Sequence, residues 1–448
     1  MRWSNDKNRE DDSGDRRSLR PMRFIALLLC LPSLCLASGK IFSVECAPSK
    51  EPGELVFGVT YTIWVPDGAP KIRGVIVHQH GCGEGACKGG ETAAYDLHWQ
   101  ALARKWDCAL MGPSYHQPEK ENCRLWCDPR NGSDRTFLKS LSDLAVKSGH
   151  AEIAEAPWCL WGHSGGGFWS SIMQTLHPER IVAIWFRSGT AFGYWNKGEV
   201  PKPEMPAAMF EIPMMCNPGA KENGDKRFNS AWTGNMEMFK DYRAKGAPIG
   251  FAPDPLTGHQ CGDSRYLAIP FFDACLAMRL PESGGKLKAI DQKSAWLAPL
   301  LGDAGKPAAS FDGNKNESCW LPNEAVAKAW AEYVKTGSTA DTTPPPAPTG
   351  VNSTRNAEGL TEITWSAEAD FESGIQQFII ERDGKETGRV PEKPVGKFGR
   401  PLFQTMSFHD TPERPLPEMK WVDRERVDNI VAPKYVVRAV NSVGLSSR

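Results

Sequence analysis

The sequence predicts an α/β protein built on a doubly wound, mostly parallel sheet and followed by a smaller all-β domain. Between about residues 55 and 280, short strand-like runs alternate with segments that have helical spacing of apolar residues. This alternation favours parallel strands covered by helices on both faces. A proline-rich stretch at 342–348 then leads into a region of two-residue alternation and turn signals, which is typical of β-sandwiches.

Each element of the α/β part is predicted from its own pattern. Runs rich in β-branched, aromatic or continuous apolar residues, bounded by turn residues, predict strands at 55–65, 74–80, 109–111, 158–161, 181–186, 212–216 and 248–252. Apolar residues spaced by three and four predict helices at 92–106, 137–147, 167–176, 228–243 and 264–279. The strand-to-helix transitions are where α/β proteins carry their chemistry.

Size and charge exclude some classes of function. A chain of 448 residues exceeds what one core usually supports, and its contents of 40% hydrophobic and 24% charged residues are ordinary for a globular protein. The formal net charge is −1, so the chain lacks the basic excess that binds nucleic acid or an anionic membrane surface. We therefore expect no nucleic-acid partner.

Residues 1–37 are interpreted as a leader and signal peptide. Residues 1–20 are charged, and Arg23 precedes an apolar run at 24–36 that is too short to span a bilayer and has the length of a signal-peptide core. Met22 is an alternative initiator. We expect a secreted, periplasmic or extracellular protein without stable membrane insertion after cleavage; an N-terminal membrane anchor is the competing interpretation.

Cysteine usage agrees with export to an oxidising compartment. The chain has 13 cysteines, and several form close pairs within a loop or around a predicted helix: Cys82 and Cys87, Cys123 and Cys127, and Cys261 and Cys275. These pairs predict disulfides that stabilise loops, with a connectivity that spacing does not determine. A zinc site that includes Cys123 and Cys127 is the alternative, although no second pair with zinc-finger spacing follows.

The segment 158–167, with the sequence WCLWGHSGGG, carries the clearest functional signal. Its apolar run ends in G-x-S-x-G around Ser164 and a helix-like segment follows, which is the layout of a nucleophile elbow. Such a turn exposes the serine hydroxyl above the sheet. A serine in a glycine-rich turn also fits a helix N-cap, so the positions of its partners decide between the two interpretations.

Partners for this serine occur at suitable places along the chain. A serine hydroxyl is a weak nucleophile near neutral pH and requires a base and a group that orients the base. His259 lies in a loop after a strand and before the last predicted helix of this part, where the base is expected. Glu222 follows the strand at 212–216 and is the expected acid, with Asp225 in reserve and Asp254 as a weaker third candidate.

The chain order serine, glutamate, histidine resembles that of the α/β-hydrolase superfamily over about residues 50–280. The resemblance implies an oxyanion hole formed by the backbone N–H of Gly165 and that of Cys82 or Gly83, in a glycine-rich loop after an early strand. It also implies a serine esterase that needs no metal or cofactor. The expected substrates are small-molecule or polymeric esters, with acylated polysaccharides and polyesters among them; a serine peptidase of the same fold is the alternative.

Tryptophans near strand ends or in the loops that follow are candidates for lining a substrate cleft. Trp185, Trp195 and Trp232 have such positions, and their rings would suit a sugar or an aromatic group.

The expected domains follow from these assignments. A catalytic domain at 38–280 continues into an extension at 281–340, which includes a helix at 323–335 and Cys319 as a candidate attachment point. A proline-rich linker at 341–349 precedes the C-terminal domain at 350–448.

The C-terminal region resembles a fibronectin type III domain. Strands are expected at 362–366, 377–382 and 434–441, with Trp365 in the core and Tyr435 as the corner tyrosine. Such a module spaces or binds, so a non-catalytic extracellular binding protein that uses this domain is the second class of function to test.

Overall fold

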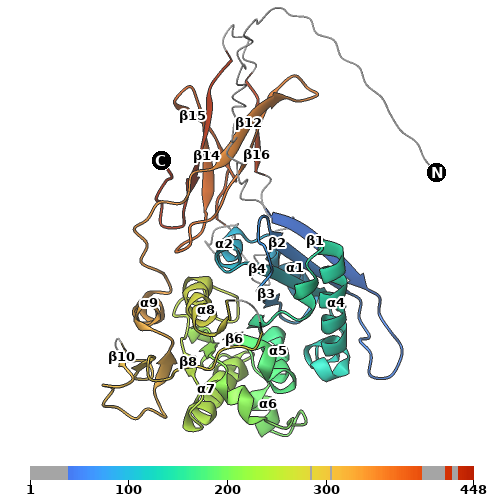
Figure 1. Cartoon of the computed structure of the whole chain (residues 1–448), viewed down its shortest axis with the longest axis vertical. Coiled ribbons are helices and arrows are strands. Elements are labelled where there is room, and N and C mark those ends of the chain that lie inside the picture. Colours follow the sequence, from blue (N-terminus) through green and yellow to red (C-terminus); the bar gives the residue numbers. More distant parts are fainter. Residues whose placement is uncertain (1–38, 283–284, 303–304, 396–418, 426–431) are drawn as a thin grey trace, which may run out of the picture. The chain divides into compact units, whose positions relative to one another are not determined.

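The computed structural model describes residues 39–282, 285–302, 305–395, 419–425 and 432–448 (Figure 1). The predicted leader and the alternative initiator Met22 lie outside the described residues. Within the described ranges, no helix combines the length and apolar character needed to cross a bilayer.

Eight strands of the described chain form one central sheet: β1 Gly39–Cys46, β2 Val59–Pro66, β3 Gly74–Gln79, β4 Cys108–Tyr115, β5 Trp158–His163, β6 Ile181–Arg187, β7 Met214–Asn217 and β8 Ile249–Phe251. Their order is β1-β2-β4-β3-β5-β6-β7-β8. Strand β2 pairs antiparallel with β1 and β4, and the other neighbours are parallel. The carboxyl ends of β3, β5, β6, β7 and β8 therefore meet at one edge of the sheet.

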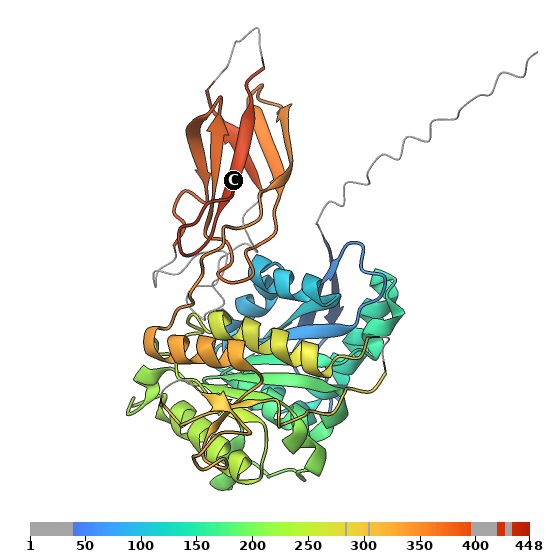
Figure 2. The same cartoon turned by 60° about the vertical axis from the view of Figure 1, so that its left-hand side comes forward.

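Helices cover the parallel part of this sheet: α1 Glu84–Ala93, α2 Leu97–Lys105, α3 Arg124–Cys127, α4 Ser133–Ser148, α5 Gly165–Leu176, α6 Phe192–Asn196, α7 Asn229–Ala244, α8 Arg265–Arg279 and α9 Glu324–Thr336. Every residue of β3, β5 and β6 is buried, which requires cover on both faces. Figure 2 shows α8 (yellow) and α9 (orange) next to each other in front of the sheet, and the two helices are in contact.

The predicted helix at 92–106 is wrong at its start. Asp96 accepts the backbone N–H groups of His98 and Trp99 (3.0 and 3.2 Å), so it caps a separate helix, α2. The glycine-rich segment before it forms α1, which the sequence did not predict because glycine lowers helix propensity. The backbone contact explains the glycine: a Cβ on Gly90 would lie 1.8 Å from the carbonyl oxygen of Pro113 in β4.

The extension after α8 contains the expected helix, α9, whose N-cap Asn323 accepts the N–H of Val326. It also contains a small antiparallel sheet of β9 (Trp296–Ala298), β10 (Lys306–Pro307) and β11 (Cys319–Leu321), too short to be predicted. The expected attachment through Cys319 is not a disulfide: its buried thiol lies at β8, with Sγ 3.4 Å from the backbone N of Phe251.

The described residues of the C-terminal domain form two three-stranded antiparallel sheets, β12-β13-β16 and β15-β14-β17. Their strands are β12 Thr349–Arg355, β13 Thr361–Ser366, β14 Gln377–Arg382, β15 Lys385–Val390, β16 Lys420–Asp423 and β17 Tyr435–Val440. Trp365 and Phe378 pack in the core between them, 5.4 Å apart. The Tyr435 hydroxyl donates to the Asp423 carboxylate (2.7 Å), whereas a corner tyrosine donates to backbone.

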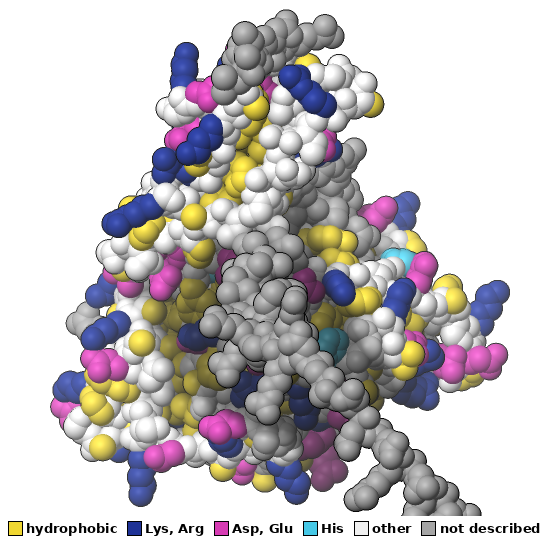
Figure 3. Space-filling view, turned by 45° about the horizontal axis from the view of Figure 1, so that its top comes forward, with side chains coloured by type: hydrophobic (Ala, Val, Ile, Leu, Met, Phe, Trp, Pro, Cys, Tyr) yellow, Lys and Arg dark blue, Asp and Glu magenta, His cyan; other side chains and the backbone are white. Residues whose placement is uncertain are grey.

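Side chains of both charge signs are interspersed on the face of the molecule seen in Figure 3. This distribution matches the small net charge. The mostly parallel sheet with its helices, followed by separate antiparallel sheets, confirms the predicted fold class: an α/β-hydrolase fold with a C-terminal all-β domain.

We predict that Gly90→Ala lowers the free energy of unfolding by about 1–3 kcal/mol, because the added methyl overlaps the backbone of β4. Gly193→Ala is the matched control, since a Cβ at this helical glycine would meet its nearest atom at 3.5 Å. Urea unfolding measures both variants. Equal midpoints for the two would contradict the packing argument.

Candidate active site

Ser164 lies immediately after β5 and has the backbone geometry of a sharp turn. Its φ of 53° and ψ of −113° belong to a region that residues with a side chain rarely adopt. The turn is held from both sides, since the Ser164 N–H donates to the Arg187 carbonyl (2.9 Å) and the Phe168 N–H donates to the Ser164 carbonyl (3.1 Å). A strained serine between a strand and a helix is the geometry of a nucleophile elbow.

Ser164, His259 and Glu222 form one hydrogen-bonded row. His259 Nε2 lies 2.8 Å from Ser164 Oγ, and His259 Nδ1 lies 2.6 Å from Glu222 Oε1. With a neutral imidazole, Nδ1–H donates to the carboxylate and Nε2 accepts from the hydroxyl. The Glu222 side chain is completely buried and that of His259 is 20% exposed, so of these two side chains the histidine is the one that faces the site opening.

The structure brings Glu222, and neither of the other acid candidates, to His259. Glu222 sits in the short helix η5 (Ala220–Glu222), and its second oxygen accepts the N–H of Gly219 at 3.0 Å. In the described chain, neither Asp225 nor Asp254 is hydrogen-bonded to His259. Asp225 is exposed and accepts two backbone N–H groups, which lower the pKa of its carboxyl; Asp254 accepts the N–H of Leu256.

A buried arginine fixes the loop that carries the histidine. The Arg187 guanidinium, at the end of β6, donates to the carbonyl oxygens of Gly258 (3.1 Å) and Gln260 (3.0 Å), which flank His259. It also donates to the Thr257 hydroxyl at 2.8 Å. Sequence reasoning missed this residue, although an arginine at the end of an otherwise apolar strand is a signal that could have indicated it.

Histidines next to the elbow are structural and neutral. His163 Nε2 donates to the His259 carbonyl at 2.6 Å, and burial holds the pKa of His163 well below its ordinary value. Burial lowers the pKa of His78 to about 3 and that of His80 to about 4. The His80 ring donates to the Gly81 carbonyl and accepts the Tyr115 N–H, so its position is fixed by the loop backbone.

The predicted oxyanion loop lies beside Ser164 and is held by a disulfide. Cys82 is bonded to Cys123, and a Cβ on Gly165 would lie 2.3 Å from Cys82 Sγ, so the helix start and the disulfide are in close contact. The N–H of Gly83 donates to Gln117 Oε1 at 3.2 Å and is therefore already engaged. The backbone groups of Cys82 and Gly165 are the better candidates.

The disulfide supplies the connectivity that spacing left open: Cys82 joins Cys123 of another loop, and neither cysteine bonds within its own loop. Cys127 retains a buried thiol, and burial raises its pKa. The sulfurs of Cys82, Cys123 and Cys127 lie within 4.8 Å of one another, but two of them are used by the disulfide.

Two hollows meet at Ser164 and His259. One has a volume of about 310 Å³ and is lined by aromatic, cationic and small polar residues, including Phe168, Tyr194 and Arg124. The other has a volume of about 690 Å³ and a partly acidic wall that includes Glu119 and Glu121. Ser164, His259 and Phe228 belong to the walls of both hollows, so a molecule bound at Ser164 has space in each.

The tryptophan hypothesis is wrong for this site. Trp185 and Trp195 are buried in the core, Trp232 packs on Phe251 at 5.5 Å, and none of the three lines either hollow. Aromatic walls come instead from Phe168, Tyr194 and Phe228.

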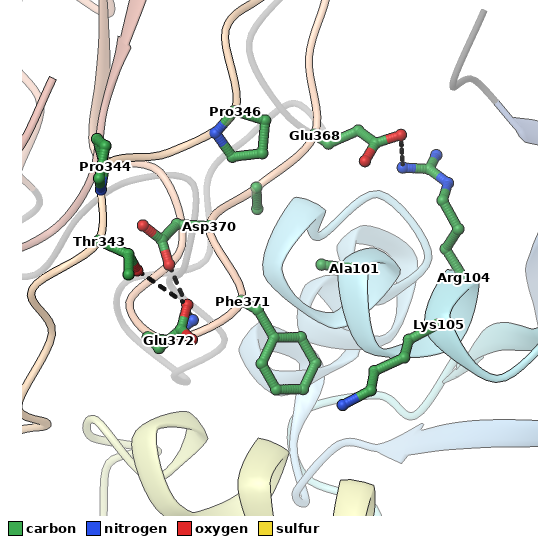
Figure 4. Close-up of a pocket in the computed structure, with 11 residues that line it drawn as sticks. Ala101, Arg104, Lys105, Thr343, Pro344, Pro346, Glu368, Asp370, Phe371 and Glu372 are labelled. Carbon is green, nitrogen blue, oxygen red and sulfur yellow. Dashed lines mark hydrogen bonds and ion pairs between the residues drawn. The ribbon is translucent and has the colours of Figure 1, made fainter. Parts of the chain in front are cut away.

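A further hollow lies between α2 and residues 343–372 (Figure 4). Arg104 and Glu368 form an ion pair there at 2.8 Å, and Lys105 lies over the Phe371 ring at 4.6 Å. The described residues that line it include no serine, cysteine or histidine. This hollow therefore has, among its described residues, no serine or histidine that could replace Ser164 and His259 as nucleophile and base.

Comparison with known proteins gives distant structural similarities. No family model and no curated protein matches the chain. Among solved structures, a ferulic acid esterase is 16% identical, with 50% of this chain and 92% of that chain covered and a TM-score of 0.34. An S-formylglutathione hydrolase from Agrobacterium tumefaciens is 15% identical (54% and 94% covered, TM-score 0.35), and a Pyrococcus horikoshii acylaminoacyl peptidase is 12% identical (55% and 43%, TM-score 0.38). Similarities of this size indicate neither activity nor substrate, so the function is inferred from the site.

We predict that Glu222→Gln lowers kcat by about 10³- to 10⁴-fold, because an amide in place of the carboxylate no longer favours the Nδ1–H form of His259. Asp225→Asn retains an oxygen that accepts backbone N–H groups and should change kcat less than about threefold. Steady-state kinetics on a p-nitrophenyl ester measures both. A larger loss for Asp225→Asn would contradict the assignment of the acid.

We also predict that the double variant Cys82→Ala/Cys123→Ala unfolds more easily, by about 2–4 kcal/mol, since the disulfide closes a loop with a sequence separation of 41. Its kcat should fall as well, because the loop beside Ser164 loses its covalent attachment. Cys46→Ala, a half-buried thiol in β1, is the control. Unchanged kcat in the double variant would show that the disulfide does not support the site.

Proposed function

We propose that the chain is a secreted serine hydrolase that cleaves carboxylic esters with Ser164 as nucleophile, His259 as base and Glu222 as the orienting acid. The observation that carries the proposal is the continuous row from Ser164 Oγ through both ring nitrogens of His259 to the buried Glu222 carboxylate, with links of 2.8 and 2.6 Å. A serine hydroxyl that is hydrogen-bonded to an oriented imidazole is the arrangement required for its activation as a nucleophile.

The proposed reaction follows the hydrogen-bonded row from Ser164 to Glu222. As Ser164 Oγ forms a bond to the acyl carbon, its proton moves to His259 Nε2, and the imidazolium is stabilised by Glu222. The carbonyl oxygen takes up the negative charge, and the backbone N–H groups of Gly165 and Cys82 are the proposed donors to it. The bond between the acyl carbon and the alcohol oxygen then breaks, His259 gives its proton to the leaving alkoxide, and the acyl group stays on Ser164 Oγ. A water molecule next gives its proton to His259 and bonds to the acyl carbon, the bond to Oγ breaks, and the acid leaves as His259 returns the proton to Ser164.

The two hollows support a substrate with a substantial group on each side of the ester bond. Rings of Phe168, Tyr194 and Phe228 favour a flat or cyclic group in the smaller hollow. An acylated sugar or an aryl ester is the substrate class that these walls favour; polyester segments belong in the same test.

Export is the proposed location, and the disulfide supports it, because such bonds persist in oxidising compartments. The C-terminal domain is proposed to be of fibronectin type III kind, on the strength of its two three-stranded sheets. Its role is then to space the catalytic domain from a surface or to bind one.

A fluorophosphonate probe tests the proposal, since it reacts with an activated serine and leaves an inert hydroxyl unmodified. The wild-type chain should be labelled, and Ser164→Ala should lose the label completely while keeping its thermal midpoint. On a panel of acetylated sugars, short p-nitrophenyl esters and peptide amides, the unlabelled enzyme should hydrolyse the esters in preference to the amides. The labelled enzyme should hydrolyse none of them. Failure of the folded wild-type chain to react would favour a binding protein, and preference for the amides would indicate a peptidase.

A further inference from the structure

The two hydrogen bonds of His259 leave the faces of its ring to be packed by other residues. Both bonds, to Ser164 and to Glu222, are made by ring nitrogens and therefore act in the plane of the imidazole. Loop hydrogen bonds from Arg187 and His163 reach only the backbone around His259. The orientation of the ring face therefore depends on what lies against it.

Phe228 lies against that face. The ring centres of Phe228 and His259 are 3.9 Å apart and their planes are 8° from parallel, the closest and flattest of the stacked pairs in the described structure. Phe228 is half-buried and lines both hollows at Ser164. The ring therefore borders the substrate space and covers the base at the same time.

The backbone around Phe228 is held by the carboxylate of Asp225, the second candidate for the acid. Asp225 Oδ1 accepts the N–H of Arg227 at 2.8 Å and that of Phe228 at 2.7 Å, just before α7 begins at Asn229. The Asn229 side chain accepts the N–H of Gly224 at 2.7 Å. These bonds fix the turn from which the phenyl ring reaches His259.

We infer that Phe228 is a positioning residue for His259, acting through the face of the imidazole that it covers. This inference rests on the proposed function. When His259 takes the Ser164 proton it becomes a cation, and an aromatic face at this distance attracts a cation more strongly than a neutral ring. The stack thus favours the imidazolium that forms when Ser164 gives up its proton, as well as the ring orientation that precedes this step.

The contact predicts a kinetic signature that simple packing would not produce. Phe228→Leu should lower kcat about tenfold on a small aliphatic ester, which has no ring to stack on Phe228, with little change in KM, because the effect arises only once the imidazolium forms. Phe228→Tyr and Phe228→Trp, which keep an aromatic face, should retain kcat within about threefold of wild type. Phe210→Leu is the control, a half-buried phenylalanine packed on Tyr242 away from both hollows.

Asp225→Ala provides a second test, which keeps the Phe228 side chain but loosens the turn that holds it. It removes the acceptor of the Arg227 and Phe228 N–H groups and should lower kcat severalfold in the same direction. If Phe228→Leu gives no cooperative thermal transition, the aromatic substitutions and Asp225→Ala decide the question.

Three results would overturn the inference: wild-type kcat in Phe228→Leu, a rise in KM at constant kcat, or equal losses in the leucine and aromatic variants. The first and third would make the ring a packing group, and the second would make it a substrate contact. These results are distinct from failure of the proposed function, in which the wild-type enzyme itself shows neither esterase activity nor Ser164 labelling.

Discussion

The hydrogen bond between the buried Glu222 carboxylate and His259 Nδ1 is the interaction on which the site depends. A carboxylate with no exposure is costly unless its oxygens are satisfied, and here one oxygen accepts from the imidazole and the other from the Gly219 N–H. The same bond selects the Nδ1–H form of the histidine, which leaves Nε2 to accept the Ser164 proton. One hydrogen bond therefore both stabilises the buried carboxylate and sets the tautomer that lets His259 act as a base.

The rest of the fold serves to bring three loops to this bond. Parallel strands deliver Ser164, Glu222 and His259 to the same sheet edge because each follows the carboxyl end of β5, β7 or β8. Arg187 then links the loops: besides the carbonyls around His259, it donates to the Asn217 carbonyl at 2.9 Å, at the end of β7. Its buried charge is satisfied by several neutral acceptors, so it holds the loops without competing for Glu222.

The sequence was sufficient for the residues that follow strands and insufficient for contacts between loops. Ser164, Glu222 and His259 could be proposed because a motif and strand ends locate them. By contrast, the Cys82–Cys123 bond and the Gln117 contact to Gly83 join segments separated by more than 30 residues. Local spacing carries no information about such contacts.

Two further misses have physical reasons of the same kind. Helix α1 forms despite its glycines because the tight approach of Gly90 to β4 requires them, so tertiary packing overrides propensity. Phe228 looked like an ordinary residue of a helical pattern, and only the fold shows that its ring covers His259.

The central claim, that Glu222 acts only through His259, is tested most directly by a double-mutant cycle in kcat. His259→Ala alone and His259→Ala/Glu222→Gln together should show the same residual rate, because removing the imidazole already removes whatever the carboxylate contributes. Losses that multiply in the double variant would show that the two side chains act independently and would contradict the account.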